Sequence, residues 1–324
     1  MGTYADHRSE GLGGLATGRV EHAGDVAVGI PGAGVGAVVT AKHVRGKGAH
    51  LLAAAAALGG FVLTRVVVEQ VVVGGGHQRL QGIRCGGLAG AVGAELSNVD
   101  LGANLSDATI AEIHKALLDH GVIFFHDQEF DANAHKRLAL RFGDIFIHPF
   151  FDTRGQDPEI VMIHREPGDT HIVGEDWHSD TAMVKSPPMG AILFAIKVPD
   201  YGGDTLFASQ VHAYDALSDG MKRMIADLKV VNSDIRVAGP TTTRNENRTT
   251  KSRMDANWVA TETAHPVVRT HPETGRKSLY CDRSYSIRFE GMTEEESAPL
   301  LDYLMDWGTR PEFTCRFRWR KGSV

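Results

Sequence analysis

The stretch Trp177-His178-Ser179-Asp180 places an imidazole and a carboxylate two residues apart. On an extended segment both side chains point to the same face, because successive side chains of a strand alternate. A nitrogen and a carboxylate oxygen that converge in this way can supply two of the three ligands of a 2-His-1-carboxylate iron site. A His-x-Asp triplet also arises by chance on surface strands. The rest of the chain therefore decides between a metal site and two polar surface residues.

The composition is that of a soluble globular protein. The chain has 324 residues, of which 42% are hydrophobic and 23% are charged, and its formal net charge is -6. This charge provides no basic surface for nucleic acid. The longest apolar run, residues 51–63, is too short to cross a bilayer, so no membrane association is expected. Three widely spaced cysteines form neither a metal motif nor a disulfide framework, which favours the reducing cytoplasm.

Two parts of the chain differ in amino-acid composition. Residues 1–79 are rich in Gly, Ala and Val, and their only aromatic residues are Tyr4 and Phe61. Few large side chains are present there to offset the loss of chain entropy on ordering. We predict that residues 1–79 are either a disordered extension or the product of a misassigned gene start. A folded domain is predicted over residues 80–324.

Capping signals predict three helices in this domain. Ser106 and Asp131 cap helices that end at Gly121 and Gly143, and a capping box begins at Thr293. Strands are predicted at residues 122–125, 190–198, 204–209, 265–270, 277–282 and 313–319. Many short strands with added helices favour a mainly β (α+β) domain built on a jelly-roll double sheet.

A polar stretch, residues 233–262, interrupts this pattern. It is either a solvated loop or a mobile lid over a site, since long irregular insertions in compact domains are often functional or disordered.

Beyond the opening stretch, short motifs follow one another along the chain. They are Phe142-Gly143-Asp144, Ile147-His148-Pro149, Ser186-Pro187-Pro188-Met189-Gly190-Ala191, Gly202-Gly203-Asp204-Thr205-Leu206-Phe207-Ala208-Ser209, His265-Pro266-Val267-Val268-Arg269-Thr270-His271-Pro272 and Pro311-Glu312-Phe313. In this order they resemble the taurine dioxygenase (TauD/TfdA) family of iron(II)- and 2-oxoglutarate-dependent dioxygenases over about residues 84–324. The resemblance implies a double-stranded β-helix (jelly-roll) core. It also implies a reaction in which O2 and 2-oxoglutarate hydroxylate a small organic acid, with succinate and CO2 as co-products.

The resemblance assigns roles to single residues. His178 and Asp180 match the metal ligands and are the expected catalytic residues. Thr205 matches the threonine that binds the distal carboxylate of 2-oxoglutarate, and His148 matches a donor to the anionic head group of the substrate. Tyr285 matches an aromatic residue that packs on the substrate. The structural alternatives are a sheet-pairing threonine for Thr205 and a turn histidine before proline for His148.

Two positions of the expected substrate pocket depart from the taurine-specific pattern. Phe151 stands in place of a tyrosine and Gly174 in place of an asparagine, and neither side chain offers a polar donor. We therefore expect a larger or less polar acid than taurine, such as a sulfonate, a sulfate ester or a phenoxyalkanoate. Family members are often oligomers, so a homo-oligomer is expected by analogy.

The largest departure from the family is at the C-terminal end. In the family a distal histidine, the third iron ligand, and an arginine that clamps 2-oxoglutarate follow a strand like residues 313–319. Neither is present before Val324, so the core is expected to be incomplete at the C-terminus. The chain is then either a fragment of a longer gene product or a short protein without activity. We expect residues 1–324 alone to show no 2-oxoglutarate turnover.

Two other functions compete with the dioxygenase. One is a catalytically inactive member that binds small acids or a partner on the same scaffold. The other is a zinc hydrolase built on His178 and Asp180, but the motif offers no obvious third ligand or general base for it.

Overall fold

The fold is described here from a computed structural model for residues 62–63, 82–129, 131–151, 157–200, 202–240, 242–252 and 257–324. All of these residues belong to one compact unit of the chain, residues 34–324. The predicted extension, residues 1–79, lies outside the described residues apart from Val62 and Leu63.

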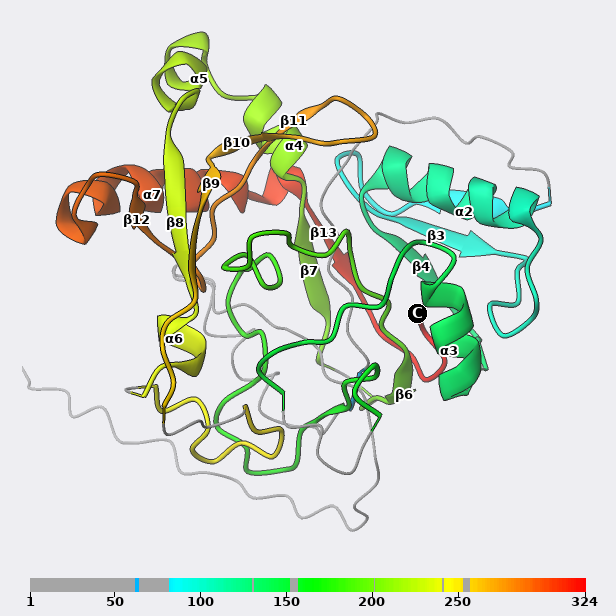
Figure 1. Cartoon of the computed structure of the whole chain (residues 1–324). Coiled ribbons are helices and arrows are strands. Elements are labelled where there is room, and N and C mark those ends of the chain that lie inside the picture. Colours follow the sequence, from blue (N-terminus) through cyan, green and yellow to red (C-terminus); the bar gives the residue numbers. More distant parts are fainter. Residues whose placement is uncertain are drawn as a thin grey trace, which may run out of the picture. The chain divides into compact units, whose positions relative to one another are not determined.

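The domain mixes short helices and short strands (Figure 1). The helices are α2 (Asp107–His120), α3 (Ala132–Ala139), α4 (Gln210–Asp215), α5 (Asp219–Ile225), α6 (Ile235–Ala238), α7 (Glu294–Gly308) and the 3-10 helix η1 (Pro311–Phe313). The strands are β1 (Val62–Leu63), β2 (Arg84–Gly87), β3 (Ala94–Ser97), β4 (Ile123–Phe125), β5 (Ile163–His164), β6 (Ala195–Lys197), β7 (Thr205–Ala208), β8 (Lys229–Ser233), β9 (Glu262–Pro266), β10 (Val268–Thr270), β11 (Lys277–Leu279), β12 (Ser286–Phe289) and β13 (Thr314–Phe317).

The strands form five small sheets among the described residues. One has the order β2-β3-β4, with β3 and β4 parallel, and another has the antiparallel order β12-β8-β9. The remaining pairs, β1-β6, β10-β11 and β13-β7, are antiparallel. The β13-β7 pair sets Phe317 opposite Thr205. The end of β13 therefore lies beside the start of β7, where Thr205 is located.

The predicted helix starts are confirmed. Ser106 Oγ accepts a hydrogen bond from the Thr109 amide at 3.1 Å at the start of α2. Asp131 Oδ1 accepts from the Ala134 amide at 2.8 Å at the start of α3. The capping box that begins at Thr293 is complete in α7. Each cap satisfies backbone N–H groups that the first turn of a helix leaves without a partner.

Several predicted element bounds are wrong. The strand predicted at residues 265–270 is divided between β9 and β10, and of residues 277–282 only β11 forms. Helix α3 ends at Ala139 instead of continuing to Gly143, because the next amides, of Arg141 and Phe142, donate to carbonyls three positions back and form turns. Of the strand predicted for residues 190–198, only β6 forms. The preceding apolar side chains, including Phe194, pack against the cluster that also contains residues of α2 and β4.

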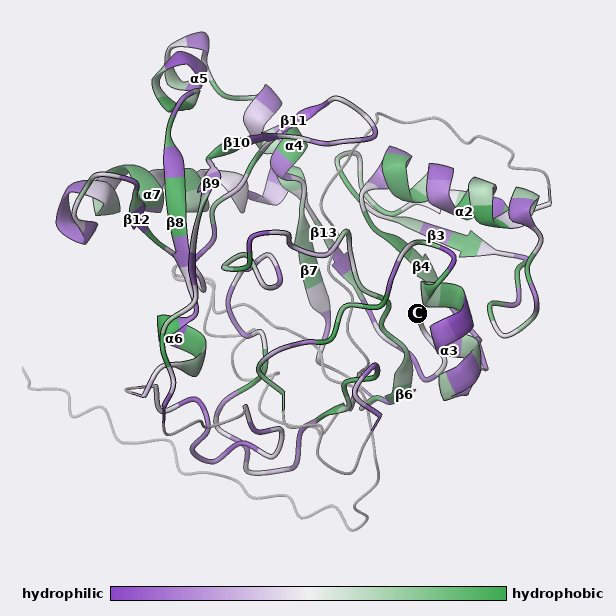
Figure 2. Cartoon of the chain, viewed as in Figure 1, coloured by the Kyte–Doolittle hydropathy of each residue, from purple (hydrophilic) through white to green (hydrophobic). Residues whose placement is uncertain are grey.

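Helix α7 packs beside the β12-β8-β9 sheet (Figure 1). Its Leu301 and Leu304 share a buried cluster with Val230 of β8 and Phe289 of β12. A second cluster joins Ile110 and Ile113 of α2 to the β2-β3-β4 sheet. Figure 2 shows alternating hydrophobic and hydrophilic stretches along α2 and α3, as expected for helices with one buried face. None of the helices in the described ranges is long and apolar enough to span a membrane.

His135 of α3 is a buried histidine whose titration couples folding to pH. Its Nε2 lies 3.0 Å from the Ile192 carbonyl oxygen, and burial lowers the pKa of its imidazole. In acid the unfolded chain binds a proton at this position and the folded chain does not, so stability falls as pH drops below about 6.5.

We expect His135→Gln, whose amide can still donate to Ile192, to lose less stability than the wild type between pH 7 and pH 5.5. Urea unfolding at the two pH values measures the difference. Burial also lowers the pKa of other histidines, such as His265, so the variant reduces the pH dependence without removing it. An identical pH dependence in both proteins would contradict the assignment.

Candidate metal and co-substrate site

His178 and Asp180 lie side by side in the structure. His178 Nε2 is 3.1 Å from Asp180 Oδ1, and the two side chains are only 13% and 4% exposed. The structure thus brings the two predicted metal ligands together, with the atoms that bind metals facing each other.

A hydrogen bond fixes the histidine ring. His178 Nδ1 lies 2.7 Å from the backbone carbonyl oxygen of Asp176. A carbonyl only accepts, so Nδ1 carries a proton, and in the neutral form of the ring the lone pair is then on Nε2, which faces the Asp180 carboxylate. Two acceptors at this separation repel each other unless a proton or a cation lies between them. A histidine that binds a metal usually donates its other N–H to a carbonyl or carboxylate in this way.

The backbone conformation of residues 177–181 differs from the extended strand expected there. Residues 177–179 belong to no helix or strand, and Asp180 begins a turn, so the predicted strand is wrong. Thr181 has φ 51°, in the left-handed region that a β-branched residue seldom adopts. Its hydroxyl donates to the Asp180 carbonyl at 2.8 Å. Such strain costs about 1–3 kcal/mol and clusters at functional sites, which singles out this turn.

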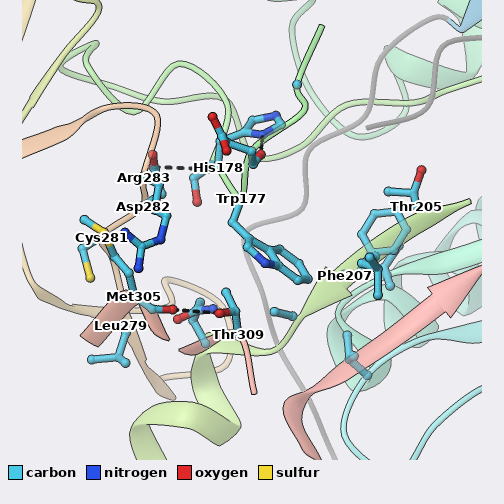
Figure 3. Close-up of a pocket in the computed structure, with 18 of the residues that line it drawn as sticks. Trp177, His178, Thr205, Phe207, Leu279, Cys281, Asp282, Arg283, Met305 and Thr309 are labelled. Atoms are coloured by element: carbon cyan, nitrogen blue, oxygen red, sulfur yellow. Dashed lines mark hydrogen bonds between the residues drawn. The ribbon is translucent and has the colours of Figure 1, made fainter. Parts of the chain in front are cut away.

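The pair lies between two cavities. His178 lines a cavity of about 120 Å³ together with Trp177 and Thr205. Asp180 lines a larger cavity of about 560 Å³ together with His148 and a mainly apolar wall. In Figure 3 the Trp177 indole points toward β7, while Asp282 lies on the opposite side of the Trp177–His178 segment. A metal held by the pair would therefore face two separate binding spaces.

Thr205 is oriented by an indole. It is buried at the start of β7, and Trp319 Nε1 donates a hydrogen bond of 2.8 Å to its Oγ1. Because the Thr205 oxygen already accepts, its own O–H is directed to a different acceptor. This arrangement combines the two interpretations of Thr205: the residue pairs in a sheet and also presents a hydroxyl donor beside the cavity that His178 lines.

His148 has the geometry of a turn histidine and also reaches the larger cavity. Its Nδ1 accepts a hydrogen bond from the Phe150 amide at 3.2 Å, which places the proton of the neutral ring on Nε2. A donor to an anionic head group needs that tautomer. The ring centroid lies 4.7 Å from that of Phe151.

The two predicted aromatic residues line neither cavity. Phe151 is buried in a core cluster with Phe124 and Phe317. Tyr285 is 4% exposed and packs in a cluster with Met183, three residues after Asp180. Their predicted contact with the substrate stays a prediction.

Asp282 is a site residue that the sequence analysis missed. It lines the smaller cavity at 7% exposure, and its Oδ2 accepts a hydrogen bond from the Ser179 amide at 3.2 Å. Burial raises the pKa of its carboxyl to about 6, although hydrogen bonds from backbone amides act to lower it. No motif near residue 282 signals this contact, because its partner is 103 positions away.

The predicted lid, residues 233–262, contains helix α6, and its residues 242–252 form hydrogen bonds beside the site. Asp169 accepts hydrogen bonds from the amide and the hydroxyl of Thr249, each at 3.0 Å. Arg244 Nη2 donates to Asp176 Oδ2 at 3.1 Å. These contacts join residues 242–252 to the segment that orients His178. The lid role itself stays a prediction.

The imidazole of His178 and the carboxylate of Asp180 are donor types that suit iron(II). Neutral imidazole and carboxylate are two of the ligands of the facial triad of non-haem iron oxygenases. Within the part of the chain that the structure describes, no group of three or more His, Cys, Asp or Glu side chains is placed to hold a metal. His178 and Asp180 are the candidate protein ligands among these residues, and their role in metal binding stays a prediction.

Comparison with known proteins confirms the resemblance over most of the chain. The model of the family described as "Taurine catabolism dioxygenase TauD, TfdA family" matches residues 86–324. An alkylsulfatase of Acinetobacter baylyi is 33% identical over 241 residues, which cover 73% of this chain and 74% of that protein. An alpha-ketoglutarate-dependent sulfate ester dioxygenase of Pseudomonas putida is 30% identical, covering 73% of this chain and 78% of that protein.

A solved structure shows the same likeness in three dimensions. The crystal structure of a taurine dioxygenase from Burkholderia xenovorans superposes with a TM-score of 0.57 at 29% identity. The superposition covers 75% of this chain and 78% of that one. Its fold agrees with the mixed α+β architecture described above.

Proposed function

The chain belongs to the TauD/TfdA family of 2-oxoglutarate-dependent dioxygenases, and on that basis we propose that it hydroxylates an organic acid of the sulfate ester or sulfonate type. Succinate and CO2 are the co-products. The observation that carries the proposal is the pair of His178 Nε2 and Asp180 Oδ1, which lie 3.1 Å apart. His178 Nδ1 donates a hydrogen bond to the Asp176 carbonyl. We further propose that the short strands around this pair belong to the double-stranded β-helix core of the family.

In the proposed site His178 and Asp180 would hold iron(II). When bound, the metal supplies the oxygen activation that couples decarboxylation of 2-oxoglutarate to hydroxylation of a C–H bond. The chain's own residues position and shield the reactants. Asp176 keeps the proton on His178 Nδ1, which leaves Nε2 free of a proton and ready to bind the metal.

In this proposal 2-oxoglutarate and the organic acid bind in different cavities. The Thr205 hydroxyl, held by Trp319, donates to the distal carboxylate of 2-oxoglutarate on the His178 side. The organic acid occupies the larger cavity on the Asp180 side, where His148 donates to its anionic head group. The apolar walls of that cavity keep water from the reacting C–H bond.

The size and character of the larger cavity support a long apolar substrate tail. About 560 Å³ of mainly apolar space extends from Asp180 toward α2 and α3, much more than a two-carbon sulfonate fills. Each methylene that leaves water for such a space contributes about 0.8 kcal/mol. An alkyl sulfate ester therefore suits the cavity better than taurine. Hydroxylation at the carbon that bears the sulfate gives an unstable adduct, which collapses and releases sulfate.

We expect KM to fall roughly fourfold for each methylene added to an alkyl sulfate until the tail fills the cavity. The assay supplies the protein, expressed from its complete gene, with iron(II), 2-oxoglutarate and O2, and measures succinate for ethyl to dodecyl sulfate and for taurine. Taurine turnover equal to that of octyl sulfate would contradict the proposed substrate class.

The same assay separates the enzyme from the alternative, an inactive member that binds small acids. That alternative predicts octyl sulfate binding by calorimetry with no succinate. Succinate release that depends on octyl sulfate excludes it.

A further inference from the structure

We infer that Asp282 is a positioning residue whose carboxylate sets the geometry of the metal pair by holding the backbone at Ser179, between His178 and Asp180. This inference rests on the proposed metal site and adds a residue to it. The segment Asp282–Arg283 contacts the chain one residue before and one residue after His178. The Arg283 amide donates to the Trp177 carbonyl at 3.3 Å, and the Ser179 amide donates to Asp282 Oδ2 at 3.2 Å.

The second oxygen of the same carboxylate shapes the neighbouring turn. Asp282 Oδ1 accepts hydrogen bonds from the amides of Ser284 and Tyr285, at 2.9 and 2.8 Å. Tyr285 packs in the cluster that contains Met183, on the far side of Asp180. One carboxylate thus organises the backbone that precedes Asp180 and the aromatic residue that packs behind it.

Rigid elements hold Asp282 itself in place. Its amide donates to Ser286 Oγ at 3.0 Å, and the Ser286 hydroxyl donates to Asn232 Oδ1 of β8 at 2.8 Å. The guanidinium of Arg283 forms ion pairs with Asp302 and Asp306 of α7, at 3.1 and 2.6 Å. The contact with Ser179 therefore fixes residues 177–180, called the metal loop below, relative to the β12-β8-β9 sheet and α7.

The network is buried and interdependent. Asn232, Ser286 and Asp282 are 0%, 1% and 7% exposed. Buried polar groups are costly unless they are paired, and here successive hydrogen bonds connect Asn232 of the sheet through Ser286 and Asp282 to Ser179. Residues that orient metal ligands in this way typically contribute 10–100-fold to metal affinity when they are mutated. In Figure 3, Asp282 and Arg283 lie directly against the Trp177–His178 segment.

The test uses the full chain with Co(II), whose visible absorption reports binding, and four variants. We expect Asp282→Ala to weaken Co(II) binding about 10–100-fold. Asp282→Asn keeps one acceptor oxygen and should fall between alanine and the wild type. Ser297→Ala is the matched control, because Ser297 is fully buried and accepts from the Phe289 amide at 2.9 Å without touching the metal loop. It should bind Co(II) like the wild type. The fourth variant is His178→Ala.

A metal-free readout separates positioning from general destabilisation. The Nδ1 proton of His178, held by the Asp176 carbonyl, should give a slowly exchanging imidazole resonance in the NMR spectrum. We expect Asp282→Ala to lose or shift this resonance and Ser297→Ala to keep it. An unchanged resonance in Asp282→Ala overturns the inference, as does an equal loss of affinity in Asp282→Ala and Ser297→Ala. If His178→Ala binds Co(II) like the wild type, the proposed metal site fails, and the resonance still decides the positioning role.

Discussion

Replacement of His178 by alanine is expected to lower divalent metal affinity by more than about 100-fold, beyond the loss typical of residues that only orient a ligand. The imidazole is one of the two proposed protein ligands, and its Nε2 lies 3.1 Å from Asp180 Oδ1. Without it a single carboxylate remains, which does not hold iron(II) or Co(II) tightly. Titration of the full chain with Co(II), followed by visible absorption, measures the change.

His212→Ala is the matched control for this experiment. His212 is a partly buried histidine of α4, and burial lowers the pKa of its imidazole. It lines neither cavity, so its removal should leave Co(II) affinity unchanged while it tests for non-specific losses. Equal affinities in His178→Ala and the wild type would show that the metal, if bound, uses other residues.

Thr205→Val is expected to weaken 2-oxoglutarate binding about 10–100-fold. Valine keeps the shape of threonine but removes the hydroxyl donor, and a hydrogen bond to a charged group contributes about 1.5–3 kcal/mol. The variant also leaves Trp319 Nε1 buried without its acceptor, which costs about 1–3 kcal/mol of stability. Calorimetry with 2-oxoglutarate and thermal unfolding measure the two effects separately.

A double variant separates the two roles of this hydroxyl. Thr205→Val with Trp319→Phe removes the donor and the acceptor together, so stability should recover while 2-oxoglutarate affinity stays low. Thr314→Val, on the paired strand β13, removes a threonine hydroxyl that donates to the Pro311 carbonyl, and it should bind 2-oxoglutarate normally. Recovery of affinity in the double variant would contradict the assignment of Thr205.

Local signals in the sequence predicted much of the fold. The caps at Ser106, Asp131 and Thr293 act within three residues of chain, so their chemistry is visible in the sequence alone. The hairpin of β10 and β11 forms around a turn whose residues already favour it. Apolar runs were less informative. In residues 190–198 most side chains are half-buried by tertiary contacts, and hydrophobicity could not distinguish a strand from a packed irregular segment.

The candidate site was predictable in its chemistry more than in its geometry. His178 and Asp180 are residue types that can bind a metal, so the sequence alone indicates them as candidates, and the structure places them together. The strained turn at Thr181 and the support from Asp282 depend on contacts with distant parts of the chain. Such contacts leave no periodic or spaced pattern near either partner, so sequence reasoning could not find them.

The role of Trp319 shows the same limit. It lies on the segment that follows β13, 114 positions from Thr205, and only the register of the β13-β7 pair brings its indole to the hydroxyl. From the sequence, the residue was one member of an alternating strand. In the structure it orients the proposed donor to 2-oxoglutarate.

The measurement that tests the account most directly is an anaerobic titration of the protein, expressed from its complete gene, with iron(II) and 2-oxoglutarate. If His178 and Asp180 hold iron beside the cavity that Thr205 lines, the chelate gives a visible charge-transfer band. That band should saturate at one iron per chain and be absent in His178→Ala. No band at saturating iron and 2-oxoglutarate, or the same band in His178→Ala, would contradict the proposed site.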